Sequence, residues 1–297
     1  MPHVTANGIG IEYEEFGPKY GTPFLLISGY TGQMTGWRDD FIESLVDEGF
    51  RVIRFDNRDI GLSHQFDDLG IPDMGKIVAG LKDGSASDLA PYTLNDMAAD
   101  AAALLAELEA TPAIVMGVSM GGMITQVLAL NHPEHVKAII PTMTTSGDPS
   151  LTMSTPEAQK MLTERPASPT RGAIVERAIQ SSGVFGSKGE LAPTKDEVAE
   201  KAGREFDRAY RPAGMARQYA AIIAQPRWHH RLADLSMPAL VLHGSADTLI
   251  LPACGEDAAS RIPGAQFVII DDWGHDMPVK AVPKVLEHVI PFAKSVS

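Results

Sequence analysis

Residues 113–130, AIVMGVSMGGMITQVLAL, constrain the fold of this chain more than any other stretch. Residues 113–118 are apolar and partly β-branched, and the run is too short for a helix, so we predict a strand buried on both faces. Apolar residues then recur at helical spacing, at Met123, Ile124, Val127 and Leu128. Ser119 therefore lies at an abrupt turn from strand to helix, beside the free N–H groups of a helix N-terminus.

Glycines on both sides of Ser119 fit such a turn. Gly117 and Gly121 complete the pattern G-x-S-x-G, in which the serine backbone is strained and the strand and helix approach closely. The pattern alone is weak evidence in a chain with 27 glycines, so the prediction depends on its context of strand, turn and helix. We predict that Ser119 is a nucleophile.

Composition limits the classes of protein to which the chain can belong. Its 297 residues, 44% of them hydrophobic, are enough to bury a large core. The net charge of −13 disfavours nucleic acid and anionic membranes as partners. The single cysteine, Cys254, excludes an intramolecular disulfide, and no apolar run reaches bilayer length. The first residues lack a basic region followed by an apolar run, so we expect no leader peptide. We expect a globular cytoplasmic protein.

Further apolar runs predict the other strands of the sheet. They lie at residues 9–16, 24–27, 51–55, 137–142, 239–243 and 266–270, and Asn7-Gly8 indicates that the first belongs to a hairpin at the sheet edge. Helical patterns separate most of them, including residues 93–108 with Thr93 as the expected N-cap and Asp96 three residues later. This alternation predicts an α/β fold with a mostly parallel central sheet flanked by helices.

Two stretches interrupt the alternation of strands and helices. Residues 62–91 predict a small inserted helix, because apolar residues recur at helical spacing at Met74, Ile77, Val78 and Leu81. Residues 143–234 contain helical patterns, loop-forming clusters and no strong strand, which is typical of a helical cap over a site. We therefore expect a core domain of residues 1–142 and 235–297 and a cap of residues 143–234.

A serine nucleophile needs a base, and the base works best when a carboxylate fixes its tautomer. Asp247 follows the strand expected at 239–243, and His275 follows the strand expected at 266–270. Loops after the carboxyl ends of parallel strands meet at one edge of the sheet, so Ser119, Asp247 and His275 are expected to converge. The chain order Ser, Asp, His also matches a known order of triad residues.

Each partner of Ser119 has an alternative. Asp271 and Asp272 could supply the carboxylate, but they precede His275 so closely that we expect them to shape its loop. His243 could be the base, but at a strand end we expect a buried, hydrogen-bonded structural histidine.

Other polar residues have simpler expected roles. His229 and His230 are adjacent, point in different directions in a helix, and lack an accompanying ligand pattern, so no metal and no cofactor is implied. Arg58 and Asp56 are expected to form a salt bridge that holds the loop after the strand at 51–55.

These motifs together resemble the α/β-hydrolase fold superfamily over nearly the whole chain. The resemblance depends on the Ser28-Gly29-Tyr30 loop, DNRDIGLS at 56–63, GVSMGG at 117–122, HGSAD ending at Asp247, and Gly274-His275. Among the branches, the chain is most similar to bacterial esterases of the aclacinomycin methylesterase type. The resemblance implies that the backbone N–H groups of Tyr30 and Met120 form an oxyanion hole. Ser28 departs from the histidine common at that position.

The sequence thus predicts a carboxylesterase that cleaves small to medium hydrophobic esters through an acyl-enzyme. Lactonase, thioesterase, C–C bond hydrolase and perhydrolase activities on the same triad stay open. So does a receptor that keeps the triad, binds a small ligand and turns it over slowly. The expected partner is a small-molecule ester, with no nucleic acid or membrane partner, and the oligomeric state does not follow from the sequence.

Overall fold

The computed structural model describes residues 2–164 and 166–297. Within them one sheet has the strand order β1-β2-β4-β3-β5-β6-β7-β8. The strands β4, β3, β5, β6, β7 and β8 run parallel, whereas β1 and β2 form an antiparallel hairpin whose strand β2 pairs with β4. The mostly parallel sheet is confirmed. The strand bounds are His3–Ala6, Ile9–Phe16, Pro23–Ile27, Arg51–Phe55, Ala113–Val118, Val136–Thr142, Leu240–Gly244 and Gln266–Ile270, for β1 to β8 in order.

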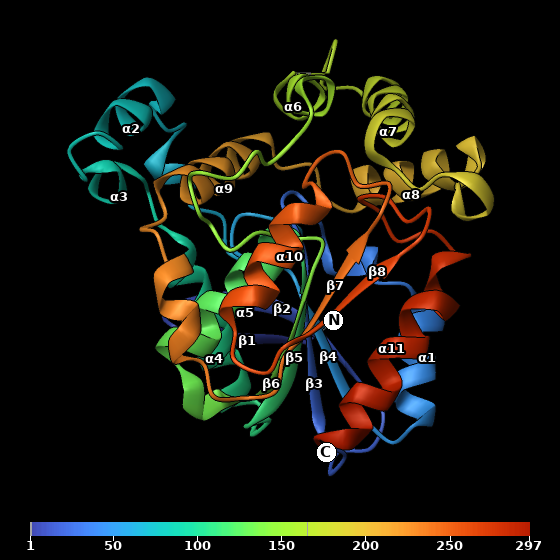
Figure 1. Cartoon of the computed structure of the whole chain (residues 1–297). Helices are drawn as coiled ribbons and strands as arrows, with labels where there is room; N and C mark the ends of the chain where they lie inside the picture. Colours follow the sequence, from blue (N-terminus) through green and yellow to red (C-terminus); the bar gives the residue numbers. More distant parts are fainter. Residues whose placement is uncertain (1, 165) are drawn as a thin grey trace.

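Helices cover both faces of the sheet (Figure 1). One face packs against α4 (Leu94–Glu107), α5 (Met120–Asn131) and α10 (Pro252–Arg261). The other face packs against α1 (Asp39–Asp47) and α11 (Ala281–Ser295), which also contact each other. The fold is therefore a three-layer arrangement with the sheet in the middle.

Alternation along the central strands divides their side chains between two cores. Leu25 and Ile27 of β3 lie in the core with α4 and α5, whereas Phe24 and Leu26 lie in the core with α1 and α11. All four side chains are fully buried. Strands buried on both faces read as continuous apolar runs, which explains why they were recognisable in the sequence.

Helix α4 begins as its sequence predicts. The Thr93 hydroxyl oxygen accepts a hydrogen bond from the backbone N–H of Asn95, and the Asp96 carboxylate accepts one from the Thr93 N–H at 2.8 Å. This reciprocal capping satisfies donors that the first helical turn leaves free.

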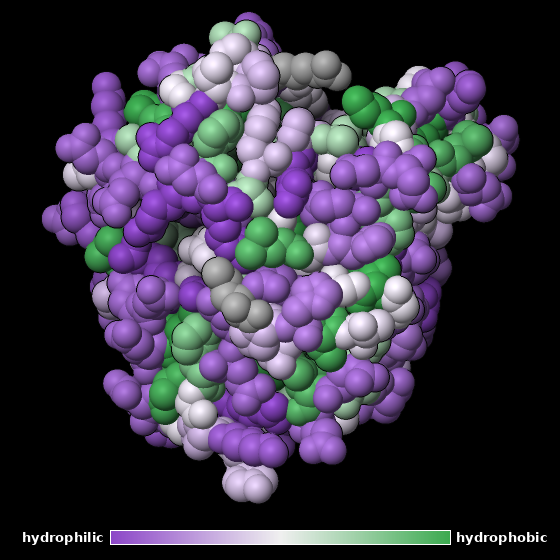
Figure 2. All heavy atoms as spheres, turned by 180° about the vertical axis from the view of Figure 1, so that it is seen from behind, coloured by the Kyte–Doolittle hydropathy of each residue, from purple (hydrophilic) through white to green (hydrophobic). Residues whose placement is uncertain are grey.

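The insertion at 62–91 forms two short helices, α2 (Met74–Gly80) and α3 (Ala86–Leu89), after a 3₁₀ turn, η2 (Asp67–Leu69). The two helices project from the main body (Figure 1) and pack against α9 (Pro212–Ala224). The outer surface of the insertion is mixed in hydropathy (Figure 2), with Ile71 before α2 and Val78 on α2 exposed by 70% and 51%. The insertion therefore buries only the side that packs against α9.

Helices and 3₁₀ turns are the regular elements that the structure describes in residues 143–234, and loops join them. The elements are α6 (Pro156–Thr163), α7 (Arg171–Phe185), η4 (Gly189–Leu191), α8 (Lys195–Arg208), α9 and η5 (His229–Asp234). Helices α6 to α9 lie beyond the carboxyl edge of the parallel strands (Figure 1). The segment leaves after β6 and returns at β7, which are neighbours in the sheet.

The end of the helical segment packs into one of the two cores. Trp228 and Leu232, near the end of the helical segment, are buried in the core with α4 and α5.

Across residues 2–164 and 166–297, every helix is too short or too polar to cross a lipid bilayer.

Candidate active site

Ser119 occupies the turn between β5 and α5 in a strained backbone conformation. Its φ is 57° and its ψ is −120°, a combination that side chains avoid unless their surroundings impose it. A Cβ on Gly117 would lie 2.1 Å from the carbonyl oxygen of Gly121, and one on Gly121 would lie 2.2 Å from that of Ile27. The two glycines are therefore required for the close approach of strand and helix, as the sequence predicts.

Backbone and side-chain hydrogen bonds hold this turn against β6 and the loop after it. The Ser119 N–H donates to the Thr142 carbonyl at 2.9 Å, and the Thr144 hydroxyl donates to the Ser119 carbonyl at 2.8 Å. The strained conformation is thus secured from the neighbouring strand as well as from the glycines.

Loop 28–33, which contains Tyr30, lies beside Ser119. A Cβ on Gly29 would lie 3.8 Å from Ser119 Oγ. Asn57 Nδ2 donates to the Ser28 carbonyl at 3.0 Å, and the Ser28 hydroxyl donates to the Gln33 carbonyl at 3.3 Å. Ser28 therefore ties the loop to itself at the position where the superfamily commonly has a histidine.

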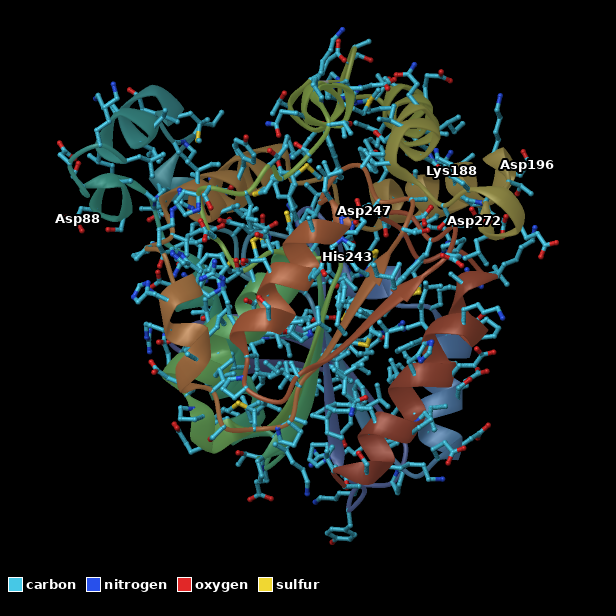
Figure 3. The ribbon with its side chains drawn as sticks, viewed as in Figure 1. Asp88, Lys188, Asp196, His243, Asp247 and Asp272 are labelled. Carbon is cyan, nitrogen blue, oxygen red and sulfur yellow. The ribbon has the colours of Figure 1, made fainter. Side chains whose placement is uncertain are left out.

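Asp247 and His275, the predicted carboxylate and base, are in direct contact. His275 Nδ1 lies 2.7 Å from Asp247 Oδ2, and the Asp247 side chain is fully buried at the carboxyl end of β7 (Figure 3). The backbone N–H groups of Leu249 and Ile250 both donate to Asp247 Oδ1 at 2.9 Å. One carboxylate oxygen is thus held by the backbone, and the other is left for the imidazole.

The pKa values of this pair are shifted in opposite directions. Burial raises the pKa of Asp247, but the positive charge of His275 and hydrogen bonds from His243 and His275 outweigh it and lower the pKa to about 2. Burial lowers the pKa of His275, but the Asp247 charge and hydrogen bond outweigh it and raise the pKa above its ordinary value. Asp247 is therefore a carboxylate at neutral pH.

The residues that were alternatives to Asp247 and His275 lie in different surroundings. Asp271 and Asp272 are exposed, and the Asp272 carbonyl accepts a hydrogen bond from the Lys188 N–H at 2.8 Å (Figure 3). His243 is fully buried, its Nε2 lies 2.8 Å from the Ile250 carbonyl oxygen, and it is 3.5 Å from Asp247 Oδ2. His243 thus supports the loop that carries Asp247.

The end of α7 holds the loop that carries His275, which the sequence did not indicate. The His275 N–H donates to the Phe185 carbonyl at 2.6 Å, and the Phe185 ring meets the imidazole edge-on at 6.2 Å between centroids. The Gly274 N–H donates to the Ser187 hydroxyl at 3.0 Å, and that hydroxyl donates to the Asp276 carboxylate. These partners are nearly 90 residues apart in the chain, so no local pattern could reveal them.

The predicted salt bridge between Arg58 and Asp56 is wrong. Arg58 Nε pairs with Asp100 Oδ2 on α4 at 2.6 Å, and Asp56 Oδ2 pairs with Arg208 on α8 at 2.7 Å. The chain turns after β4, so the two side chains leave in different directions. Asp56 is further occupied by the backbone N–H groups of Met34 and Leu62.

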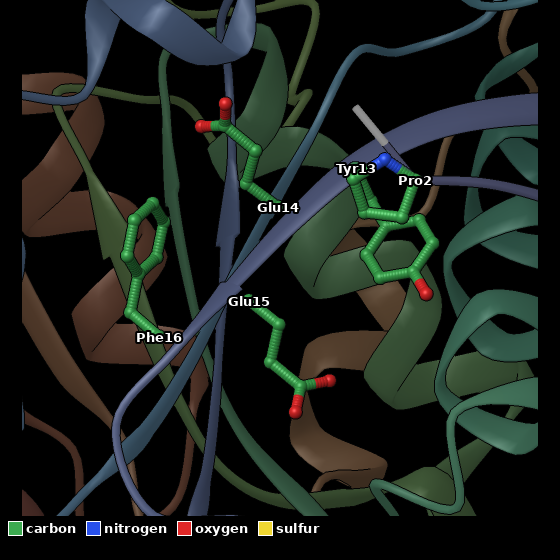
Figure 4. A pocket seen from close by; sticks show the side chains of 5 residues that line it. All are labelled: Pro2, Tyr13, Glu14, Glu15 and Phe16. Carbon is green, nitrogen blue, oxygen red and sulfur yellow. The ribbon is translucent and has the colours of Figure 1, made fainter.

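A surface pocket of about 370 Å³ lies elsewhere on the molecule (Figure 4). It is lined by Pro2 and by the β2 residues Tyr13, Glu14, Glu15 and Phe16. Strands β4 and β3 separate β2 from β5, which places this pocket away from Ser119. Its two carboxylates are already paired, Glu14 with Arg54 at 2.7 Å and Glu15 with Arg51 at 2.8 Å.

Residues 22–281 match the family described as alpha/beta hydrolase fold. The chain belongs to this family. Among curated relatives, the chain is 26% identical to rhodomycin D methylesterase DauP of Streptomyces sp. (strain C5), over 93% of this chain and 92% of the relative. It is 29% identical to a poly(3-hydroxyalkanoate) depolymerase of Ectopseudomonas oleovorans, over 87% of this chain and 80% of the relative.

Solved structures agree with the α/β-hydrolase assignment. An esterase from Thermogutta terrifontis has a TM-score of 0.73 and 25% identity, covering 99% of this chain and 98% of its own. The enol-lactonase from Burkholderia xenovorans LB400 shares the fold, with a TM-score of 0.75 and 22% identity over 99% of this chain and all of the neighbour. The predicted fold, the resemblance to bacterial methylesterases and the prediction of a hydrolytic enzyme are confirmed.

Proposed function

We propose that this α/β-hydrolase is a carboxylesterase with the catalytic triad Ser119, His275 and Asp247. The observation that carries the proposal is the 2.7 Å contact between His275 Nδ1 and a fully buried Asp247 carboxylate. Ser119, Asp247 and His275 follow β5, β7 and β8, which are parallel strands, so all three lie at one edge of the sheet.

Each residue is proposed to take one step in acyl transfer. Because Nδ1 of His275 donates to Asp247, Nε2 is the ring nitrogen that can accept the Ser119 proton. Ser119 Oγ attacks the ester carbonyl, and the backbone N–H groups of Tyr30 and Met120 stabilise the oxyanion that forms. His275 then protonates the leaving alcohol, and water releases the acid from the acyl-enzyme by the same route.

We propose small to medium hydrophobic esters as the substrate class. Relatives that match over most of their length and are named as a methylesterase and a depolymerase support cleavage of ester bonds by this chain. Residues 143–234 are proposed as the cap that limits the size of the acyl and alcohol groups. Residence in the cytoplasm stays a prediction from the sequence.

The proposed function is tested with p-nitrophenyl butyrate. We expect steady hydrolysis preceded by a burst of p-nitrophenol when deacylation is slow, and a butyryl group on the peptide that contains Ser119 after rapid acid quenching. Mass spectrometry of that peptide locates the acyl group. Tight binding of small hydrophobic esters with a shift in melting temperature, but with negligible turnover across a series of acyl lengths, would instead indicate a receptor.

The pH dependence should report the raised pKa of His275. A general base must be neutral, so kcat/KM is expected to fall as pH decreases through the His275 pKa, and this acid limb should lie above the ordinary value of 6.5. In Asp247→Asn the residual activity should show an acid limb at lower pH, because burial remains while the charge that raises the pKa is lost. An acid limb at the same pH in Asp247→Asn as in the parent enzyme would contradict this assignment. Asp271→Asn serves as the matched control.

A further inference from the structure

We propose that Gln218 on α9 is a positioning residue that holds loop 28–33, and with it the Tyr30 N–H, in place beside Ser119. The inference rests on the proposed function, because that function assigns the Tyr30 N–H to the oxyanion. Gln218 is fully buried. Its Oε1 accepts a hydrogen bond from the Thr31 N–H at 3.2 Å, and its Nε2 donates to the Arg58 carbonyl at 3.0 Å.

Loop 28–33 needs such a restraint because its backbone is strained. Thr31 has a φ of 63°, in the left-handed region where a β-branched residue is disfavoured. Such a conformation persists only when the surrounding contacts impose it. Thr31 directly follows Tyr30, so relaxation of this residue would turn the peptide units on either side of it. The Gln218 acceptor fixes the Thr31 N–H and opposes that relaxation.

Helix α9 is itself held rigidly against the loop at residues 56–63. Arg217, next to Gln218, pairs with Asp59 through Nε at 2.8 Å and Nη2 at 2.6 Å, and both side chains are fully buried. A Cβ on Gly214, one turn earlier, would lie 2.0 Å from the Asp59 carbonyl oxygen. Helix α9 therefore holds the Gln218 side chain in place, and its amide group joins loop 28–33 to the loop at residues 56–63.

Neighbouring contacts join the same loop to the helical segment at other points. The Tyr30 ring packs against Tyr219 on α9 with centroids 5.9 Å apart. Gln33 Nε2 donates to the carbonyls of Glu205 and Ala209 at 2.6 and 2.9 Å. These contacts hold the side chains of Tyr30 and Gln33. Gln218 is distinct because it bonds to the backbone at the strained residue.

Kinetics of Gln218→Met provide the first test, with Gln225→Met as the matched control. Gln225 directly follows α9, is also buried, and bonds to Asn95 instead of loop 28–33. We expect Gln218→Met to lower kcat for p-nitrophenyl butyrate by roughly 10-fold to 100-fold with KM within about twofold, because the oxyanion donor acts mainly in the transition state. Gln218→Glu keeps the acceptor for Thr31 and should recover part of the loss.

Hydrogen exchange of the amides in residues 28–33 provides the second test and needs no substrate. Exchange should be faster in Gln218→Met than in the parent, and unchanged in Gln225→Met, with thermal melting as the check on folding. If Gln218→Met does not fold, the same comparison is made with Gln218→Glu, in which these amides should exchange faster than in the parent because the hydrogen bond to the Arg58 carbonyl is lost.

Two results would overturn the positioning role. One is an unchanged exchange rate in a folded Gln218 variant, and the other is faster exchange with an unchanged kcat. A parent protein that hydrolyses no ester would refute the proposed function, whereas the exchange rates would still show whether Gln218 holds the loop. The two failures are therefore distinguishable.

Discussion

Ser119→Ala should lose ester hydrolysis by roughly 10⁴-fold or more and keep the fold of the parent. The hydroxyl carries the covalent step, so nothing replaces it as nucleophile. The backbone cost of the turn does not change, because alanine and serine both place a Cβ on a residue with a φ of 57°. The Ser119 N–H and carbonyl, which bond to Thr142 and Thr144, also remain.

The measurement pairs p-nitrophenyl butyrate hydrolysis with thermal melting. Ser44→Ala is the matched control, since the Ser44 hydroxyl donates to the Asp40 carbonyl on α1 at 2.8 Å, on the helix layer away from α5. We expect parent activity for Ser44→Ala. A folded Ser119→Ala protein with activity near that of the parent would refute the nucleophile assignment.

Asp247→Asn is expected to lower kcat by at least roughly 10²-fold, and a related triad loses about 10⁴-fold on the same change. The structure gives a specific reason. Leu249 and Ile250 donate backbone N–H groups to Oδ1, so the oxygen of the new amide is held there and its NH₂ group faces His275. Nδ1 must then accept a hydrogen bond, which moves the ring proton to Nε2, where it prevents proton transfer from Ser119.

Asp271→Asn and Asp272→Asn are the controls for this change. Both side chains are exposed, and Asp247 Oδ2 is the carboxylate oxygen measured at 2.7 Å from His275 Nδ1. Each control should lower kcat far less than Asp247→Asn, with melting used to exclude collapse of the loop. If Asp247→Asn keeps the kcat of the parent while either control loses most of it, the carboxylate has been assigned to the wrong strand.

The sequence predicted the elements whose signal is local. The buried strands were visible because they pack on both faces, and the α4 N-cap because Thr93 and Asp96 are three residues apart. The turn at Ser119 was visible because its close contacts require Gly117 and Gly121. The approach of Asp247 to His275 followed from parallel strand ends meeting at one edge.

The contacts between the helical segment and the loops of the core could not be predicted in this way. The sequence predicts that Arg58 pairs with Asp56, two residues before it, yet its partner is Asp100, 42 residues away, because the chain turns after β4. Gln218 bonds to a residue 187 positions earlier. Such pairs depend on how the helices pack against the sheet. Hydrophobic periodicity predicts which face of a helix is buried, but it does not predict which polar side chains then face each other.

The point at which the helical segment joins the sheet has a consequence for exchanging parts between relatives. Since residues 143–234 leave after β6 and return at β7, a foreign segment could be spliced there without disturbing the order of the strands. In this chain the end of α7 holds the His275 loop, and Gln218 holds loop 28–33. In a chimera, residues of the foreign segment would have to make these contacts. Successful grafts should therefore be those in which the new segment carries residues that make the same contacts with these two loops.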